Sequence, residues 1–207
     1  MSLPDEFAEL LNDEEPIEIS HEFEVDLNCL VTTNHKLTME GIERAESDEI
    51  AAAEESLNGE TDRDMVSSIL SGHQNFYDDL RVAARNLTLV GLVTRLQHWA
   101  SAYARRIDPK RKGGAPLDND LNFLNTKLGT PPVATDFFYK LAEVRNSVIH
   151  ADSLSQWTFK DNTRSVDPRY APNGYRVEVS DEDLRDAIEK AITQIKWYDE
   201  KLTALHK

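Results

Sequence analysis

Three polar side chains near the end of one helical stretch have the types and spacing that phosphodiester chemistry requires. Arg145, Asn146 and His150 occur in the segment FFYKLAEVRNSVIHAD, residues 137–152. Asn146 and His150 are four residues apart and share one flank of a helix, and Arg145 lies next to that flank. Arg145 and His150 are roughly 140° apart on an ideal helix, so the long arginine side chain must bend for the two to converge. A fixed cation beside a titratable imidazole suits proton transfer at a phosphate.

The segment that carries these residues has the apolar pattern of an amphipathic helix. Its apolar positions recur with a period of 3.6 residues, and they are Phe137, Leu141, Val144, Val148 and Ala151. Pro131 and Pro132 precede it, and Thr135 or Asp136 can cap its first turn. The sequence therefore predicts a helix over residues 137–152.

The same residues also have ordinary structural explanations, which the sequence leaves open. A histidine near a helix C-terminus is stabilised by the helix dipole. Arg145 could form an ion pair with Asp152 or Glu143. If Asp152 faces the site, its carboxylate favours protonated His150 and repels a phosphate.

A second group of cations surrounds a turn-rich loop at residues 108–116. Its members are Arg105, Arg106, Lys110, Arg111 and Lys112. Such cations suit the C-terminal end of a preceding helix. Contact with substrate phosphates is the alternative, which the lack of interleaved aromatic residues weakens. The five are candidate substrate-binding residues.

Motifs of several common enzyme classes are missing. The chain has no glycine-rich phosphate loop, no GxSxG elbow, no CxxC pair and no HExxH helix. The six histidines are scattered, with no pair three or four residues apart. We therefore expect no metal site and no cofactor.

The hydrophobic pattern predicts a mainly α protein with a small β element. An acidic segment, residues 1–25, contains an alternation at Ile17, Ile19, Phe23 and Val25 that is typical of a strand. Residues 26–207 form the expected helical domain, with helices over about 26–58, 62–107, 117–128 and 137–152 and a last helix after a capping box at 180–183. Gly72 and Gly91 are expected to break or kink the long second helix, and Gly129 to end the third. Alternation at 157–160 and 175–179 predicts a two-stranded ribbon within 156–179, inserted before the C-terminal helix.

The net charge of −15 is confined to the beginning of the chain. Residues 1–60 hold eighteen acids against Lys36 and Arg44, whereas residues 61–207 hold twenty acids and twenty-one bases. The part that carries Arg145 and His150 is thus nearly neutral, so a polyanionic partner is not excluded. The single Cys29 fits a reducing compartment, and the sequence lacks a secretory signal and a membrane-spanning run. We expect a cytoplasmic protein without membrane contact.

The hexapeptide Arg145-Asn146-Ser147-Val148-Ile149-His150 resembles the R-N/H/D-x3-H form of the R-x4-6-H motif of HEPN domains. Many prokaryotic toxin, abortive-infection and CRISPR-associated ribonucleases contain these all-α domains. The resemblance covers residues 27–205, and the family pattern explains neither the strand segments nor the acidic front. It implies a HEPN-like helical bundle that pairs two protomers through the 137–152 helix, so that two arginines and two histidines line one cleft.

The resemblance also implies a function. His150 would act as general acid or base on an RNA 2′-OH or a leaving 5′ oxygen, Arg145 would stabilise the phosphate charge, and Asn146 would orient Arg145 or bind the phosphate. The implied protein is a metal-independent endoribonuclease of a defence or toxin system that leaves a 2′,3′-cyclic phosphate. Its partners would be RNA and a second copy, and they could include an operon-encoded regulator or antitoxin. In the subset silenced by nucleotidyltransferase antitoxins a tyrosine lies two residues after the motif histidine, where this chain has Asp152.

Two other functions remain open. Some HEPN domains are not catalytic and bind a nucleotide or a partner protein. The chain could also be an unrelated helical interaction protein. Dimerisation through the 137–152 helix separates the first two hypotheses from the third.

Overall fold

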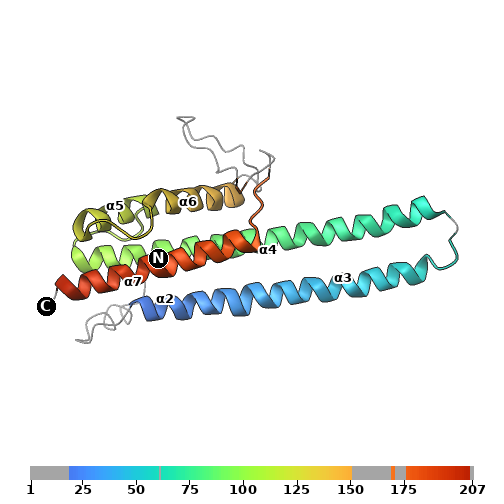
Figure 1. Cartoon of the computed structure of the whole chain (residues 1–207), viewed down its shortest axis with the longest axis horizontal. Coiled ribbons are helices and arrows are strands. Elements are labelled where there is room, and N and C mark those ends of the chain that lie inside the picture. Colours follow the sequence, from blue (N-terminus) through green and yellow to red (C-terminus); the bar gives the residue numbers. More distant parts are fainter. Residues whose placement is uncertain (1–18, 61, 151–168, 171–175, 206–207) are drawn as a thin grey trace.

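A helical bundle with one long projecting hairpin is formed by residues 19–60, 62–150, 169–170 and 176–205, the part that the computed structural model describes (Figure 1). The elements in chain order are α2 (Ile19–Asn28), the π-helix η1 (Cys29–Lys36), α3 (Leu37–Ser56), α4 (Arg63–Ile107), α5 (Leu117–Leu128), α6 (Thr135–His150) and α7 (Asp181–Leu205). The described residues contain no strand. The prediction of a mainly α protein is confirmed.

Helix α4 is the central element. It contains 45 residues without a break, about 68 Å at a rise of 1.5 Å per residue. It packs against each of the other described helices. The expected breaks at Gly72 and Gly91 are therefore wrong, because both glycines lie inside one continuous helix.

Gly91 allows a close approach between helices. A Cβ at this position would lie 2.8 Å from Leu30 Cδ1, and Leu30 of η1 is buried in the core. The missing side chain thus lets η1 pack directly onto α4. Gly41 of α3, by contrast, has open space around its missing Cβ.

These two glycines predict opposite effects of added side chains. Gly91→Val should lower the free energy of unfolding by about 1–3 kcal/mol, because the new methyl groups crowd Leu30. Gly41→Ala should raise it by about 0.5–1 kcal/mol through helix propensity. Urea unfolding followed by circular dichroism measures both, and equal effects of the two substitutions would contradict this explanation.

The core lies between the second half of α4 and the surrounding helices. Its largest buried side chains come from most elements of the bundle and include Phe23, Leu89, Leu92, Leu96, Tyr103, Leu121, Leu124, Phe138, Leu141, Ile195 and Tyr198. Burial raises the pKa of Tyr103 and of Tyr198 above the usual range of phenols. Both hydroxyls donate hydrogen bonds within the core, Tyr103 to Ile195 O and Tyr198 to Asn125 Oδ1.

The strand expected near the N-terminus is wrong for the residues that the structure describes there. Residues 19–28 form α2, which buries Phe23 and Leu27, while Val25 is 57% exposed. The burial therefore follows a helical spacing that continues to Leu30. The rest of the acidic segment, residues 1–18, lies outside the described residues.

Of the expected β-ribbon, the described residues show a single β-bridge residue, Arg176, and no strand. Its first arm, 157–160, lies outside them. In the second arm Val177 and Val179 are buried, and their backbone groups bond to a side chain of α4: Asn86 Nδ2 donates to Val177 O and Val179 N donates to Asn86 Oδ1. Arg85 Nε also donates to Val179 O. The alternation here thus reflects an extended segment fastened to α4.

Two helix ends lie where the sequence predicts them. Asp183 N donates to Ser180 Oγ and Ser180 N donates to Asp183 Oδ2, which confirms the capping box before α7. Helix α5 ends at Gly129, whose φ of 100° favours glycine.

The first half of α4 and all of α3 extend away from the bundle as an antiparallel hairpin (Figure 1). Helix α3 has no buried residue, and the first buried residue of α4 is Tyr77. Ion pairs join the two helices, Glu46 with Arg81 and Glu49 with His73. The hairpin is thus a two-helix layer without a core of its own.

A side-chain hydrogen bond of His35 connects η1 to α4. Its Nδ1 lies 2.9 Å from Thr88 Oγ1, which itself donates to Ala84 O, so His35 donates and Thr88 accepts. Burial lowers the pKa of His35 below its ordinary 6.5; Asp181 raises it and Arg85 lowers it further.

This lowered pKa predicts a pH dependence of stability. Between the lowered folded-state pKa and 6.5 the unfolded chain binds more protons than the folded one. The stabilisation is therefore complete above about pH 6.5 and is lost as the pH falls toward the folded-state pKa. His35→Gln should flatten the decline in unfolding free energy between about pH 7.5 and 5.5. Urea unfolding at a series of pH values measures this decline. His21→Gln, on the exposed face of α2, is the control and should leave the decline unchanged. Parallel declines in the wild type and in His35→Gln would contradict the view that His35 causes the pH dependence.

Candidate functional site

Helix α6 places the candidate residues at the edge of the core. Its buried positions include Phe138, Leu141 and Val144, which fix the rotation of the helix against α4 and α5. Arg145 and Asn146 follow directly and are half-buried. The helix predicted over 137–152 is thus present as Thr135–His150, and residues 151–152 lie outside the described part of the chain.

Two neutral amide oxygens hold the guanidinium of Arg145. Nη2 donates to Gln97 Oε1 at 3.1 Å and Nη1 donates to Asn146 Oδ1 at 2.9 Å. Gln97 is oriented in turn by its own bond from Nε2 to Ala115 O. Among the described residues no carboxylate forms an ion pair with Arg145, and its buried Nε has no hydrogen-bond partner. The cation is thus held in position, and no described carboxylate neutralises its charge.

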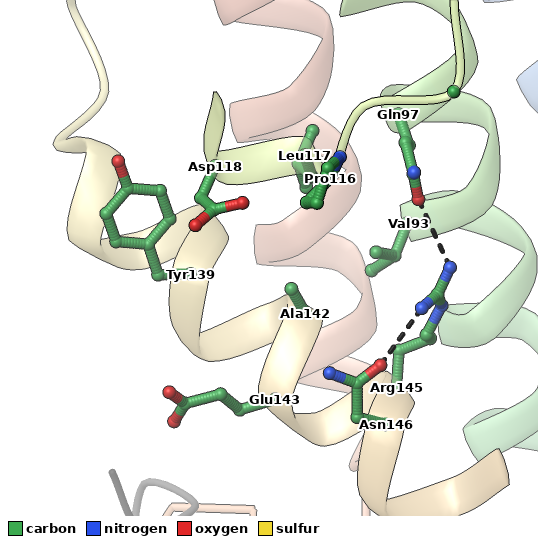
Figure 2. Close-up of a pocket in the computed structure, with 11 residues that line it drawn as sticks. Val93, Gln97, Pro116, Leu117, Asp118, Tyr139, Ala142, Glu143, Arg145 and Asn146 are labelled. Atoms are coloured by element: carbon green, nitrogen blue, oxygen red, sulfur yellow. Dashed lines mark hydrogen bonds between the residues drawn. The ribbon is translucent and has the colours of Figure 1, made fainter. Parts of the chain in front are cut away.

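A cavity of about 370 Å³ lies beside this guanidinium, between α4, α6 and the loop that leads into α5 (Figure 2). Val93, Leu117 and Ala142 supply apolar walls. Figure 2 shows Arg145, Asn146 and Gln97 on one side, and Asp118 and Glu143 across from them. The cavity thus has a cationic side and an acidic side.

His150 is the last residue of α6, and its side chain lies outside what the structure describes. The position of its backbone in the helix is nevertheless informative. Tyr139, Glu143 and Asn146 line the cavity at offsets of four and three residues, and His150 follows four residues later. Its backbone therefore continues the face of α6 that borders the cavity.

The basic cluster does not act as one surface. Arg111 is half-buried and held by its neighbours: its Nε donates to Asp120 Oδ1 at 2.9 Å, its Nη2 donates to Asn119 O, and its guanidinium lies over the ring of Phe123. The side chain of Asp120 is fully buried. Arg105 Nε donates to Ser101 O, and Arg106 also interacts with another group of the protein, so neither is a free cation. Lys110 and Lys112 are exposed.

We expect Arg111 to contribute to stability. Arg111→Met leaves the buried Asp120 carboxylate without its cation and should lower the free energy of unfolding by about 2–4 kcal/mol. Lys112→Met, one residue away and exposed, should change it by less than about 0.5 kcal/mol. Urea denaturation compares the two variants, and similar small changes in both would show that the Arg111–Asp120 pair is dispensable.

Gln97 is the site residue that the sequence did not single out. It lies 48 residues before Arg145, on a long helix whose apolar pattern gave no reason to select one glutamine. The available signal was a polar residue between Leu96 and Ala100, both of them buried. That signal indicates a polar contact but not its partner.

Comparisons of the chain with models of known protein families, with characterised proteins and with solved structures found no match. None of the described helices is both long enough and apolar enough for a membrane span. In the same part of the chain no group of three or more His, Cys, Asp or Glu could hold a metal ion. The class that the fold defines is a mainly α bundle with a projecting hairpin.

Proposed function

We propose that the protein is a metal-independent endoribonuclease of the HEPN type. The observation that carries the proposal is the state of Arg145, a guanidinium fixed by two neutral amides at the side of a cavity, with no carboxylate partner among the described residues. Of its five N–H donors, two are used in these bonds. Nε is buried, but the second N–H of Nη1 and of Nη2 forms no hydrogen bond with a described residue and can be donated to a phosphate. Such preorganised donors stabilise developing charge well.

The proposed reaction is an attack within the RNA chain. His150 takes the proton from a 2′-OH, the 2′ oxygen forms a bond to phosphorus, and the bond from phosphorus to the 5′ oxygen breaks. A second imidazole in its protonated form gives a proton to the leaving 5′ oxygen. Arg145 stabilises the extra charge on the phosphate, and Asn146 keeps the guanidinium in place. The products are a 2′,3′-cyclic phosphate and a 5′-hydroxyl.

The second imidazole requires a second protomer. Each chain supplies one Arg145 and one His150, so a dimer in which the α6 helices face each other supplies two of each. RNA is the proposed substrate, and an operon-encoded regulator could control the site in a defence or toxin system.

A non-catalytic HEPN-like module that binds a nucleotide is the second candidate. It is favoured by the acidic side of the cavity, where Asp118 and Glu143 lie across from Arg145. Carboxylates repel RNA phosphates but accept hydrogen bonds from the amino groups of a base. A cavity of about 370 Å³ lies at the lower end of the range for small-molecule sites.

The ribonuclease proposal predicts the loss of cleavage in two variants. Cleavage of a mixed RNA pool in EDTA should fall by about 10²–10⁴-fold in His150→Ala and about 10²–10³-fold in Arg145→Ala. His21→Ala on α2 and Arg44→Ala on α3 are matched controls at exposed positions and should cleave as the wild type does. The ends of the wild-type products should be cyclic phosphates.

Mixing the wild type with an excess of His150→Ala protein tests the shared cleft. A mixed dimer holds only one of the two imidazoles that the reaction needs, so cleavage should fall by more than the dilution of the wild-type protein, whereas an excess of His21→Ala should not lower it. Cleavage that survives in His150→Ala contradicts the proposal. Absence of cleavage by all proteins, together with nucleotide binding that Arg145→Ala abolishes, favours the binding module.

A further inference from the structure

The projecting hairpin carries an apolar stripe that its partner helix does not cover. Met65, Ile69, Gly72 and Phe76 recur on α4 at offsets of four, three and four residues and lie within about 60° of one another on the helix. The three larger side chains are 40%, 37% and 55% exposed in chain order. A Cβ at Gly72 would meet nothing within 4 Å, which leaves a notch in the stripe.

A different face of α4 contacts α3. This face lies about 100° around the helix from the exposed stripe. Its side chains are half-buried or buried, and they are Val66, Leu70, His73 and Tyr77. A helix with two apolar faces at this angle is typical of a bundle in which it has two neighbours. In the hairpin α4 has one neighbour among the described residues, so the second face has no partner there.

The adjoining side of α3 adds small apolar residues beside the stripe. The His73–Glu49 ion pair marks the side of the α3–α4 interface on which the stripe lies. Helical spacing places Ala45 and Ala52 on this same side of α3, since they flank Glu49 at offsets of four and three residues. Both alanines are exposed. The stripe and these two alanines thus form one apolar surface, the hairpin face, with small residues on α3 and large ones on α4.

The charge of the hairpin is strongly negative. Residues 37–80 contain twelve Asp or Glu and two Arg, a balance of −10. Among them Asp48, Glu54, Glu55 and Asp64 form no ion pair with described residues. A second copy of this hairpin would bring like charges together, whereas a basic partner would be attracted.

We propose that the hairpin face, formed by the Met65–Phe76 stripe of α4 and by Ala45 and Ala52 of α3, is a docking site for an amphipathic helix with basic flanks, supplied by a partner protein. The apolar face of that helix packs on Ile69 and Phe76 and enters the notch at Gly72. Its Lys and Arg residues lie against the acidic rim. The proposal is independent of the ribonuclease function, because the hairpin face lies on the projecting hairpin and the Arg145 cavity lies in the bundle.

Binding of a designed peptide to the full-length protein tests whether the hairpin face accepts such a helix. The probe has three heptads with leucine at the two apolar positions, lysine at the flanking positions and glutamine elsewhere. One comparison peptide has glutamate in place of lysine, and another has the same composition in scrambled order. Fluorescence anisotropy should detect binding of the first peptide alone, and binding should weaken as salt rises.

A pair of lysine substitutions distinguishes binding at the hairpin face from a general effect of charge on peptide binding. Ile69→Lys in the stripe should weaken binding by at least about tenfold, whereas Ser67→Lys, exposed on the opposite side of the same helix, should change it by less than about threefold. Phe76→Ser is a second variant in the stripe that adds no charge, and it should also lose binding. Circular dichroism checks that each variant keeps its helicity.

Three outcomes would overturn the proposal. The first is that the wild-type protein binds neither amphipathic peptide better than the scrambled one. The second is that Ile69→Lys and Ser67→Lys lose binding equally. The third is sedimentation showing a wild-type dimer that Ile69→Lys converts to a monomer, since a second copy would then cover the stripe.

Discussion

The packing of six helical elements against one long helix, α4, is the constraint on which the rest of the structure depends. The second half of α4 contributes Leu89, Leu92 and Leu96 to a core that every bundle helix shares. Gly91 removes the one side chain that would hold η1 away from this core. Asn86 on the same helix satisfies the backbone of the extended segment before α7. Elements far apart in the chain are therefore placed relative to each other through α4.

The same helix determines the chemistry available at Arg145. A half-buried guanidinium needs acceptors, and the structure supplies amide oxygens from Gln97 and Asn146. An ion pair with a carboxylate would have neutralised the charge, as the Arg111–Asp120 pair does nearby. Arg111 is bound to a buried acid, whereas Arg145 forms no ion pair with any described carboxylate. This difference is the physical basis of the proposed ribonuclease site.

Helix α4 also extends beyond the bundle, where it has a different role. Ile69 of the exposed stripe and Gln97 of the cavity are 28 residues apart, about 42 Å along the helix axis. In the bundle α4 packs against several helices, whereas in the hairpin α3 is its one neighbour among the described residues, and an apolar face of α4 is exposed to solvent there. Exposed apolar side chains cost free energy in water, so a surface of this kind is a natural binding face. The acidity concentrated in the first sixty residues includes α3, which gives this face an electrostatic preference.

The sequence by itself determined the helical class, the helix ends at Gly129 and Ser180, and the helix that carries Arg145, because local periodicity and capping chemistry decide these features. It did not decide between strand and helix at residues 19–25, since a short alternating run fits either until burial selects Phe23 and Leu27. It misjudged Gly72 and Gly91, because the stability of a 45-residue helix comes from the packing of its neighbours rather than from its own propensity. Only the tertiary structure brought Gln97 to Arg145 and Asp120 to Arg111, and only it left the Met65–Phe76 stripe without a partner among the described residues. These relations join residues that the chain separates, and a pattern along the chain contains no information on which distant surface a polar or apolar side chain meets.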